Sequence, residues 1–195
     1  THTAPCFSGF TLRDLTSDIA PISNHWKSLG ISFDCIHVGY LCEGEQTRIV
    51  GEQIDCLRNE NTSVIIDPAM ADNGKLYPGF TPAHVQDMLR LCRKADIILP
   101  NMTEASFLAG ESYDGNCSIE KAKHLIALLQ ENGCKSVVIT SVIDGENLGV
   151  IARETAQSPF LAAFQKRENI ALHGSGDVFA SAFVGEFMKA GELSA

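Results

Sequence analysis

Short, continuous apolar stretches alternate with amphipathic stretches along most of this chain. The apolar stretches are rich in β-branched residues, as buried strands are. Because they are continuous, they indicate strands covered on both faces, and the amphipathic stretches between them indicate the covering helices. The pattern predicts an α/β fold with a central, mostly parallel sheet, in one domain over residues 1–195. The expected strands are residues 33–41, 63–68, 95–101, 136–141 and 148–154.

Capping residues predict where several of the helices begin and end. A Thr-Pro step at 81–82 places an N-cap before a proline at the first helical position. Ser118 is a second expected N-cap, and the Asn-Gly step at 132–133 ends the helix that Ser118 begins. The last helix is expected to open at the glycine-rich sequence "HGSGD" (173–177).

Composition excludes several classes of partner. The 195 residues carry a net charge of -9 and contain no basic run, so neither nucleic acid nor an anionic membrane surface is expected to bind. No apolar stretch reaches the roughly 18 residues that a membrane span needs. The seven cysteines form no C-x-x-C pair, which favours reduced thiols in the cytoplasm over disulfides or a zinc site. We therefore expect a cytoplasmic protein that acts on small molecules. The chain does not begin with Met, and we expect it to be incomplete at both ends.

Polar residues stand at the carboxyl ends of the expected strands. In a parallel sheet these ends meet at one edge, and ligands bind there. Packing alone does not explain why several strands should each end in a polar or acidic group on the same edge. The residues concerned are Tyr40, Asp67, Asn101, Glu104, Thr140 and Ser141.

The "GSGD" sequence at 174–177 has two interpretations. In the simpler one, it is a glycine turn in which Ser175 or Asp177 caps a helix. In the other, Gly174 and Gly176 let the backbone approach a phosphoryl group, which the following amides and the helix dipole stabilise. The Asp177 carboxylate would then accept the proton of the attacking alcohol.

Two loops add oxygen ligands to this arrangement. One follows the second strand and holds Asp67 and Asp72, and the next holds Asn101 and Glu104. Taken separately, the first loop is a strand end followed by an Asn-Gly turn. The second is the start of an N-capped helix with Glu in its first turn. Mg²⁺ commonly takes one or two protein carboxylates together with phosphates and water. The loops and the glycine turn together favour a kinase that uses magnesium and a nucleotide.

Several segments of the chain resemble the pyridoxal kinases of the ribokinase-like superfamily, in order and in spacing. The G-[ST]-G-D motif is shared across that superfamily, whereas the opening "THT" and the Asp-Pro-x-Met-x-Asp-Asn-Gly stretch are narrower and point to the pyridoxal branch. The resemblance runs from Thr1 to about Gly191 and implies a three-layer α/β/α, Rossmann-like fold. The segments are "THT", "VGYL", "IIDPAMADNGKLY", "ADIILPNMTEASFLAG", "VVITSV" and "HGSGDVFASAFVG".

The resemblance implies an enzyme that uses ATP to phosphorylate the 5′-hydroxymethyl group of pyridoxal, pyridoxine or pyridoxamine. Asp177 is the implied catalytic base, and Gly174, Ser175 and Gly176 are the implied anion hole. Mg²⁺ is the implied metal, often with a monovalent cation such as K⁺. Members of the family are usually homodimers.

The resemblance also implies the remaining site residues. Those for the nucleotide are Asp67, Asn101, Thr140 and Ser141. Those for the metal are Asp72 and Glu104. Those that line the pyridine ring of the substrate are His2, Thr3 and Tyr40.

The chain also departs from the family pattern. Leu99 stands where many members have a Thr that contacts the nucleotide, Ala71 replaces a common Gly, and Ser175 replaces a common Thr. The family's opening βα segment and the helices that follow the last motif are expected to be missing. Two alternatives stay open. One is a kinase of hydroxymethylpyrimidine or a related small alcohol, although those enzymes usually carry Cys at the position of Asp177. The other is a ligand-binding protein of kinase ancestry without catalysis.

Overall fold

A six-stranded sheet forms the centre of the molecule. The computed structural model describes residues 9, 11–42, 44–168 and 174–193. The strands lie in the order β1-β2-β5-β6-β7-β8; the first four run parallel, and β7 and β8 continue the sheet in antiparallel pairs. Their bounds are β1 (Cys35–Val38), β2 (Ser63–Ile66), β5 (Ile97–Ile98), β6 (Ser136–Asp144), β7 (Asn147–Arg153) and β8 (Leu161–Lys166).

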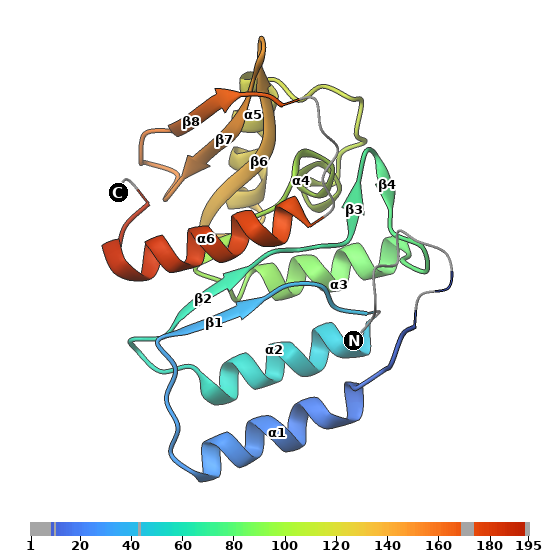
Figure 1. Ribbon diagram of the computed structural model, residues 1–195, viewed down its shortest axis with the longest axis vertical. Coiled ribbons are helices and arrows are strands. Elements are labelled where there is room, and N and C mark those ends of the chain that lie inside the picture. The colour runs from blue at the N-terminus through green and yellow to red at the C-terminus, as the bar shows by residue number, and fades with distance from the viewer. Residues whose placement is uncertain (1–8, 10, 43, 169–173, 194–195) are drawn as a thin grey trace.

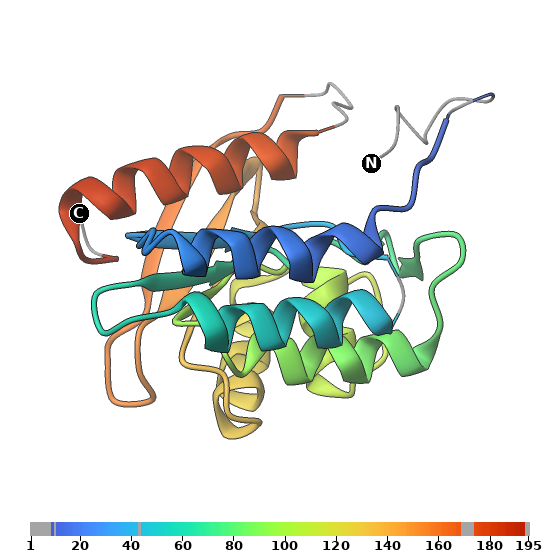
Figure 2. The ribbon, with the colours of Figure 1, turned by 90° about the horizontal axis from the view of Figure 1, so that it is seen from below.

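Helices cover both faces of this sheet, which gives the expected three layers (Figures 1 and 2). One face carries α2 (Glu45–Leu57), α3 (Pro82–Cys92), α4 (Met102–Ala109) and α5 (Ile119–Glu131). The other carries α6 (Ser175–Ala190), and α1 (Thr16–Ser28) packs against α2 beside the β1 edge. The longest helix of the described chain, α6, has 16 residues, and none of the described helices has the length and apolar character for crossing a bilayer.

The pleat of the strands explains why the apolar runs are continuous. In β2, Val64 and Ile66 point into the core under α2–α5, whereas Ile65 points into the smaller core under α6. In β6, Val137 points into the core under α2–α5 and Val138 into the core under α6. Successive side chains point to opposite faces, so a strand covered on both sides needs an apolar residue at every position.

The five expected strands are present, and the structure adds elements that the sequence pattern did not predict. These are α1, β8 and a small hairpin of β3 (Ala71–Asp72) and β4 (Lys75–Leu76). Helix α1 contains Pro21 and leaves Ile22 and Trp26 exposed, so it lacks a clear amphipathic pattern. Strand β8 forms the outer edge of the sheet and buries none of its residues fully, so its pattern is weak too.

One expected strand end lies elsewhere. Thr140 and Ser141 were expected at the carboxyl end of the fourth strand (136–141), but they lie inside β6, which continues to Asp144. The reason is that β7 pairs antiparallel with β6 and supplies hydrogen-bond partners beyond the parallel part of the sheet. The register between β6 and β7 shifts between Ile139 and Val142, so the two residues form an irregularity within the strand.

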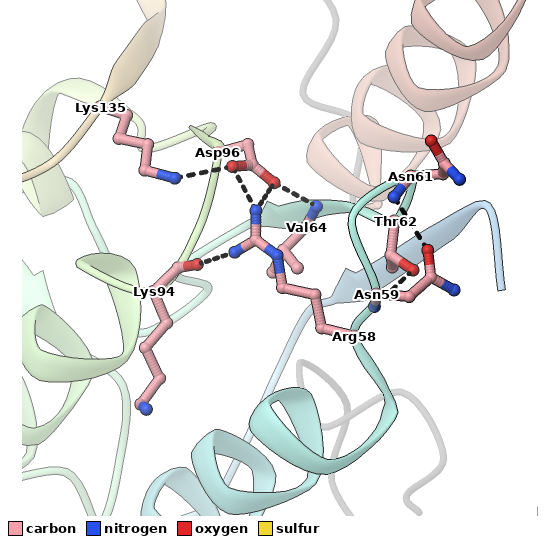
Figure 3. A network of polar contacts seen from close by, with 8 residues as sticks. All are labelled: Arg58, Asn59, Asn61, Thr62, Val64, Lys94, Asp96 and Lys135. Atoms are coloured by element: carbon pink, nitrogen blue, oxygen red, sulfur yellow. Dashed lines mark hydrogen bonds and ion pairs between the residues drawn. The ribbon is translucent and has the colours of Figure 1, made fainter. Parts of the chain in front are cut away.

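A polar network closes the edge at which the parallel strands begin (Figure 3). The Asp96 carboxylate precedes β5 and accepts hydrogen bonds from the Arg58 guanidinium at 2.6 and 2.7 Å. It also accepts from Lys135 Nζ at 2.9 Å and from the Val64 N–H at 2.9 Å. The Arg58 side chain donates in addition to the Lys94 carbonyl at 3.0 Å. The network joins β2, β5 and β6 to the end of α2.

Candidate active site

A cavity of about 670 Å³ lies at the opposite edge, where the parallel strands end. Segments far apart in the sequence meet around it: the loop after β2, the start of α4, the irregular part of β6, and the start of α6 (Figure 1). It brings together the expected anion-hole, base, nucleotide and metal residues. These lining residues are Asp67, Asp72, Asn101, Glu104, Thr140, Ser141, Gly174, Ser175, Gly176 and Asp177.

The start of α6 is built by its glycines. Gly174 is the N-cap residue with φ 81°, a left-handed conformation that favours glycine. The N-cap position is thus held by a glycine, whereas the simpler interpretation gave the capping role to Ser175 or Asp177. Asp177 lies exposed in the first turn and lines the cavity. The first N–H groups of a helix have no partners within it, and the helix dipole is positive there, so this end can receive an anion.

Asp67 lies half-buried directly after β2. Its backbone N–H donates to the Val38 carbonyl at 2.8 Å, which fixes the carboxylate beside the end of β1. Burial and, to a smaller extent, the nearby charge of Asp177 together raise the pKa of Asp67 from 3.8 to about 6. The two acids therefore repel each other across the cavity, which a bound cation would relieve.

Asn101 and Glu104 form the start of α4. The Asn101 side chain accepts from the Thr103 and Glu104 N–H groups, and the Glu104 carboxylate accepts from the Asn101 N–H at 2.9 Å, which completes a capping box. The same carboxylate accepts from the Met70 and Ala71 N–H groups at 3.0 and 3.3 Å. The N-capped helix considered from the sequence is thus confirmed, and Glu104 also holds the loop after β2.

Glu104 is only 2% exposed although it lines the cavity. Burial raises its pKa from 4.5 to about 8, while the hydrogen bond from the Asn101 N–H opposes that rise. The three hydrogen bonds described for its carboxylate all come from backbone N–H groups. The Glu104 side chain therefore lines the cavity and also holds the neighbouring backbone of the cavity wall in place.

Asp72 lies in the β3–β4 hairpin, exposed at the mouth of the cavity. Its carboxylate accepts from the Asn73 N–H and from Asn73 Nδ2, both at 2.9 Å. The turn places Asn73 at φ 49° and Gly74 at φ 76°. A Cβ on Gly74 would come within 2.8 Å of the Tyr113 ring, so the turn packs closely there and needs glycine. The Gly74 N–H donates to Thr103 Oγ1 at 3.1 Å, which fastens the hairpin to α4.

Thr140 and Ser141 reach the cavity from the irregular part of β6. Thr140 forms a parallel bridge with Asn101, so the strand keeps its pairing up to that point. Ser141 has φ 62°, which is uncommon for a residue other than glycine. This backbone turn within the strand presents both residues at the cavity edge.

Sequence reasoning missed one wall of the cavity and, outside that wall, the aromatic residues Tyr77 and Phe179. The wall comes from the β7–β8 hairpin, and a Cβ on Gly149 there would come within 2.1 Å of the Ala163 carbonyl oxygen, so the two strands require glycine. Tyr77 was an available signal, since it ends the quoted stretch that holds Asp67 and Asp72. The additional lining residues are Ala69, Tyr77, Leu99, Leu148, Gly149, Val150, Ala163, Phe164, Gln165, Phe179 and Ala180.

The expected substrate residues are not all placed. Tyr40 follows β1 at the same edge of the sheet, 41% exposed, but it is not among the described residues that line the cavity. Its ring stacks on Phe80 at 5.6 Å between centroids. His2 and Thr3 lie outside the described residues.

The donor set fits Mg²⁺ held jointly with phosphates. Among the described residues, no group of three His, Cys, Asp or Glu side chains is arranged to hold a metal alone. Mg²⁺ needs only one or two protein carboxylates when phosphates and water complete its shell. Burial, together with the charges of Glu104, Asp72, Asp67 and Asp177, raises the pKa of Tyr77 to about 12.

Comparison with known proteins agrees with this geometry. The model of the phosphomethylpyrimidine kinase family matches residues 22–195. This chain belongs to that family. Its fold matches the crystal structure of a candidate phosphomethylpyrimidine kinase from Bacteroides thetaiotaomicron, with a TM-score of 0.93 and 32% identity over 98% of this chain and 66% of that one. A second crystal form of a candidate phosphomethylpyrimidine kinase from that organism, described as holding pyridoxal, gives a TM-score of 0.87 and 33% identity over 94% of this chain and 65% of that one.

Curated relatives of this chain are named pyridoxine kinase or pyridoxal kinase. The pyridoxine kinase of Bacillus subtilis is 29% identical over 181 residues, which is 84% of this chain and 59% of that protein. A pyridoxal kinase of Dictyostelium discoideum is 26% identical over 176 residues, 83% of this chain and 55% of that protein. The resemblance found in the sequence is thus confirmed, and the chain spans less than two thirds of the length of these relatives.

Proposed function

We propose that this protein transfers the terminal phosphoryl group of ATP to the 5′-hydroxymethyl group of pyridoxal, pyridoxine or pyridoxamine. The observation that carries the proposal is the start of α6. There, an exposed carboxylate, Asp177, lies in the first turn of a helix whose N-cap residue is a left-handed glycine, Gly174, and both residues line the acidic cavity.

In the proposed mechanism, Asp177 accepts the proton of the substrate hydroxyl as the hydroxyl oxygen attacks the terminal phosphorus atom. The backbone N–H groups that begin at Ser175 donate to the oxygens of the transferring group, and the dipole of α6 adds about half a positive charge. Gly174 and Gly176 carry no side chain that would keep the phosphoryl group away from these N–H groups.

The nucleotide is held by the other loops. Asp67, Asn101, Thr140 and Ser141 line the side of the cavity proposed for ATP, and the β7–β8 hairpin forms the apolar wall next to them. Asp72 and Glu104 would hold Mg²⁺, directly or through water, and the ion supplies the charge that neutralises the phosphates when it is bound. A monovalent cation such as K⁺ is proposed as an additional activator.

Tyr40, with His2 and Thr3, is proposed to contact the ring of the alcohol. Tyr40 offers an exposed aromatic face at the correct edge of the sheet. An aromatic side chain can stack on a flat heteroaromatic ring. The protein is proposed to work as a homodimer in the cytoplasm, and the free thiols of all six described cysteines support that compartment.

A second substrate has specific support. The family whose model matches is named for phosphomethylpyrimidine, so hydroxymethylpyrimidine is the alternative alcohol. The pyridoxal reported in one structural relative and the names of the curated relatives favour the pyridoxal class.

One experiment separates these possibilities. The purified protein is incubated with ATP and Mg²⁺ and, in turn, with each of the three pyridoxal-type alcohols and hydroxymethylpyrimidine. ADP release is followed, and the phosphorylated product is identified by mass. We expect product from a pyridoxal-type alcohol with a kcat/KM at least tenfold above that for hydroxymethylpyrimidine. The reverse preference supports the alternative substrate, and tight pyridoxal binding without ADP or product supports a non-catalytic binding protein.

A further inference from the structure

Four aromatic side chains connect Tyr77, which lines the cavity, to Tyr40, which lies at the same edge of the sheet. We name them the aromatic cluster: Tyr40, Tyr77, Phe80 and His84. Phe80 is the member common to all three ring contacts. Its ring centroid lies 4.2 Å from that of His84, 5.6 Å from that of Tyr40 and 6.3 Å from that of Tyr77.

The inner end of the cluster is firmly anchored. His84 is 1% exposed and belongs to the first turn of α3, next to the core residue Val85. The helix begins with Pro82, whose ring fixes its own φ angle, and the His84 N–H donates to the Thr81 carbonyl at 3.0 Å. The half-buried Phe80 ring stacks on the His84 ring at an interplanar angle of 21°, so it rests against a rigid part of the fold.

The outer end of the cluster holds one residue of the cavity lining and one residue that is proposed to contact the alcohol. Tyr40 follows β1 and stands exposed at the edge of the sheet, where the ring of the alcohol is proposed to bind. Tyr77 follows β4 and lines the cavity beside Asp67 and Asp72. The Tyr77 N–H donates to the Met70 carbonyl at 2.9 Å, and the Phe80 N–H donates to the Tyr77 carbonyl at 3.0 Å.

We propose that Phe80 is a positioning residue for the reaction proposed above: its ring holds Tyr40 on the alcohol side and Tyr77 on the phosphate side at a fixed separation. The two tyrosines come from segments almost 40 residues apart, and Phe80 is the side chain that contacts both among the described ring contacts. Phosphoryl transfer depends on the alignment of the attacking oxygen with the phosphorus atom, and a misplacement of about 1 Å can cost about 100-fold in rate.

The proposal is tested with three variants of the protein. Phe80→Leu keeps an apolar side chain but removes the ring, and Phe80→Tyr restores a ring. Phe160→Leu is the matched control. Phe160 is 37% exposed, its ring contacts the cationic groups of Arg153 and Lys123, and it is not among the described residues that line the cavity. For each variant, kcat and KM for pyridoxal are measured together with the fraction of folded protein and the Kd for pyridoxal from calorimetry.

We expect Phe80→Leu to raise the KM and the Kd for pyridoxal about tenfold and to lower kcat per folded molecule about tenfold. Phe80→Tyr should return both constants to within about threefold of wild type, and Phe160→Leu should leave them unchanged. A Phe80→Leu protein whose KM and Kd equal those of wild type overturns the proposal, even if less of it folds. So does a Phe80→Tyr protein that is no better than Phe80→Leu.

The inference rests on the proposed function, but the two fail in different ways. If the wild-type protein consumes no ATP with any alcohol, the proposed function fails, and the Kd measurement still decides whether Phe80 shapes a pyridoxal site. If the wild-type protein is an active pyridoxal kinase and Phe80→Leu matches it in KM and Kd, the role of Phe80 fails alone.

Discussion

At the edge where the parallel strands begin, Asp96 lies among cations, whereas at the edge where they end, Asp67 lies among other acids. Burial on its own would raise the pKa of Asp96, but hydrogen bonds from Lys135, the Val64 N–H and Arg58 outweigh it and hold that pKa below its ordinary value (Figure 3). Burial also raises the pKa of Asp67, and there the neighbouring charge of Asp177 acts in the same direction, so that the pKa reaches about 6.

The contrast distinguishes an acid that stabilises the sheet, Asp96, from the acids of the cavity, which are available for binding and catalysis. A carboxylate surrounded by Arg58, Lys135 and a backbone N–H ties three strands to one another. The carboxylates at the acidic edge have no Arg or Lys partner among the ion pairs of the described residues, so they repel one another and lower stability. Strongly shifted acids in a cavity are typical of functional sites. The acidic edge is therefore expected to depend on a cation and phosphates for its charge balance, and the following variants test that difference.

The largest expected effect is that of Asp177→Asn on turnover. The amide keeps the shape of the side chain but cannot accept the proton of the alcohol, so kcat should fall about 100-fold or more. The melting temperature should stay within about 1 °C of wild type, because Asp177 is exposed and caps no helix. Calorimetry of ATP binding provides the control and should give a nearly unchanged Kd. Wild-type turnover in this variant would show that another group acts as the base.

Glu104→Ala should have the next largest effect, and on stability. Removing the carboxylate leaves the N–H groups of Met70, Ala71 and Asn101 without their acceptor in a buried place, at a cost of about 3 kcal/mol. Urea unfolding measures the loss. Glu120→Ala is the matched control, since that side chain is exposed on α5 and should change stability by about 0.5 kcal/mol or less. An equally small effect at Glu104 would mean that its role is confined to the ligands of the cavity.

The acidic edge illustrates how far the sequence alone could lead. The strand runs, the glycine turn and the Asp-Pro stretch predicted the layers and the residues that line the cavity, because apolar periodicity and turn chemistry are local signals. The bounds of β6 were wrong, since its extension depends on pairing with β7, which is not local. The wall from β8 was missed because an edge strand has a weak pattern.

Roles were harder to predict than positions. Asn101 and Glu104 line the cavity as expected, yet the hydrogen bonds described for their side chains stabilise the start of α4 and the loop after β2. The sequence allowed both roles, because a capping box and an oxygen-ligand pair use the same residue types. Tyr40 lies at the expected edge, but only the structure shows that its ring stacks on Phe80.

A moderate effect is expected from Asp96→Asn at the opposite edge. The amide still accepts from the Val64 N–H but loses its charge toward Arg58 and Lys135, and because the network is partly exposed the cost is about 2 kcal/mol at pH 7. The pKa of Asp96 is lowered on folding, so this contribution is full above its ordinary pKa and disappears as the pH falls through the folded value. Urea unfolding at pH 7 and in acid measures both. Turnover per folded molecule should not change, and a loss of turnover would contradict the division between the two edges.

The smallest expected effect has the opposite sign and comes from Asp67→Asn. The pKa of Asp67 is raised on folding from 3.8 to about 6, so the folded protein binds more protons than the unfolded one between these values. Stability is therefore lost as the pH rises through this window, and the variant should gain stability at pH 7 and none near pH 4. The full shift corresponds to about 3 kcal/mol, but screening and relaxation reduce the expected gain to about 1 kcal/mol. Unfolding is measured in EDTA without nucleotide, because a bound cation would compensate the charge. A variant that is less stable than wild type at pH 7 under these conditions would show that Asp67 has stabilising partners, as Asp96 does, and the contrast between the two edges would fail.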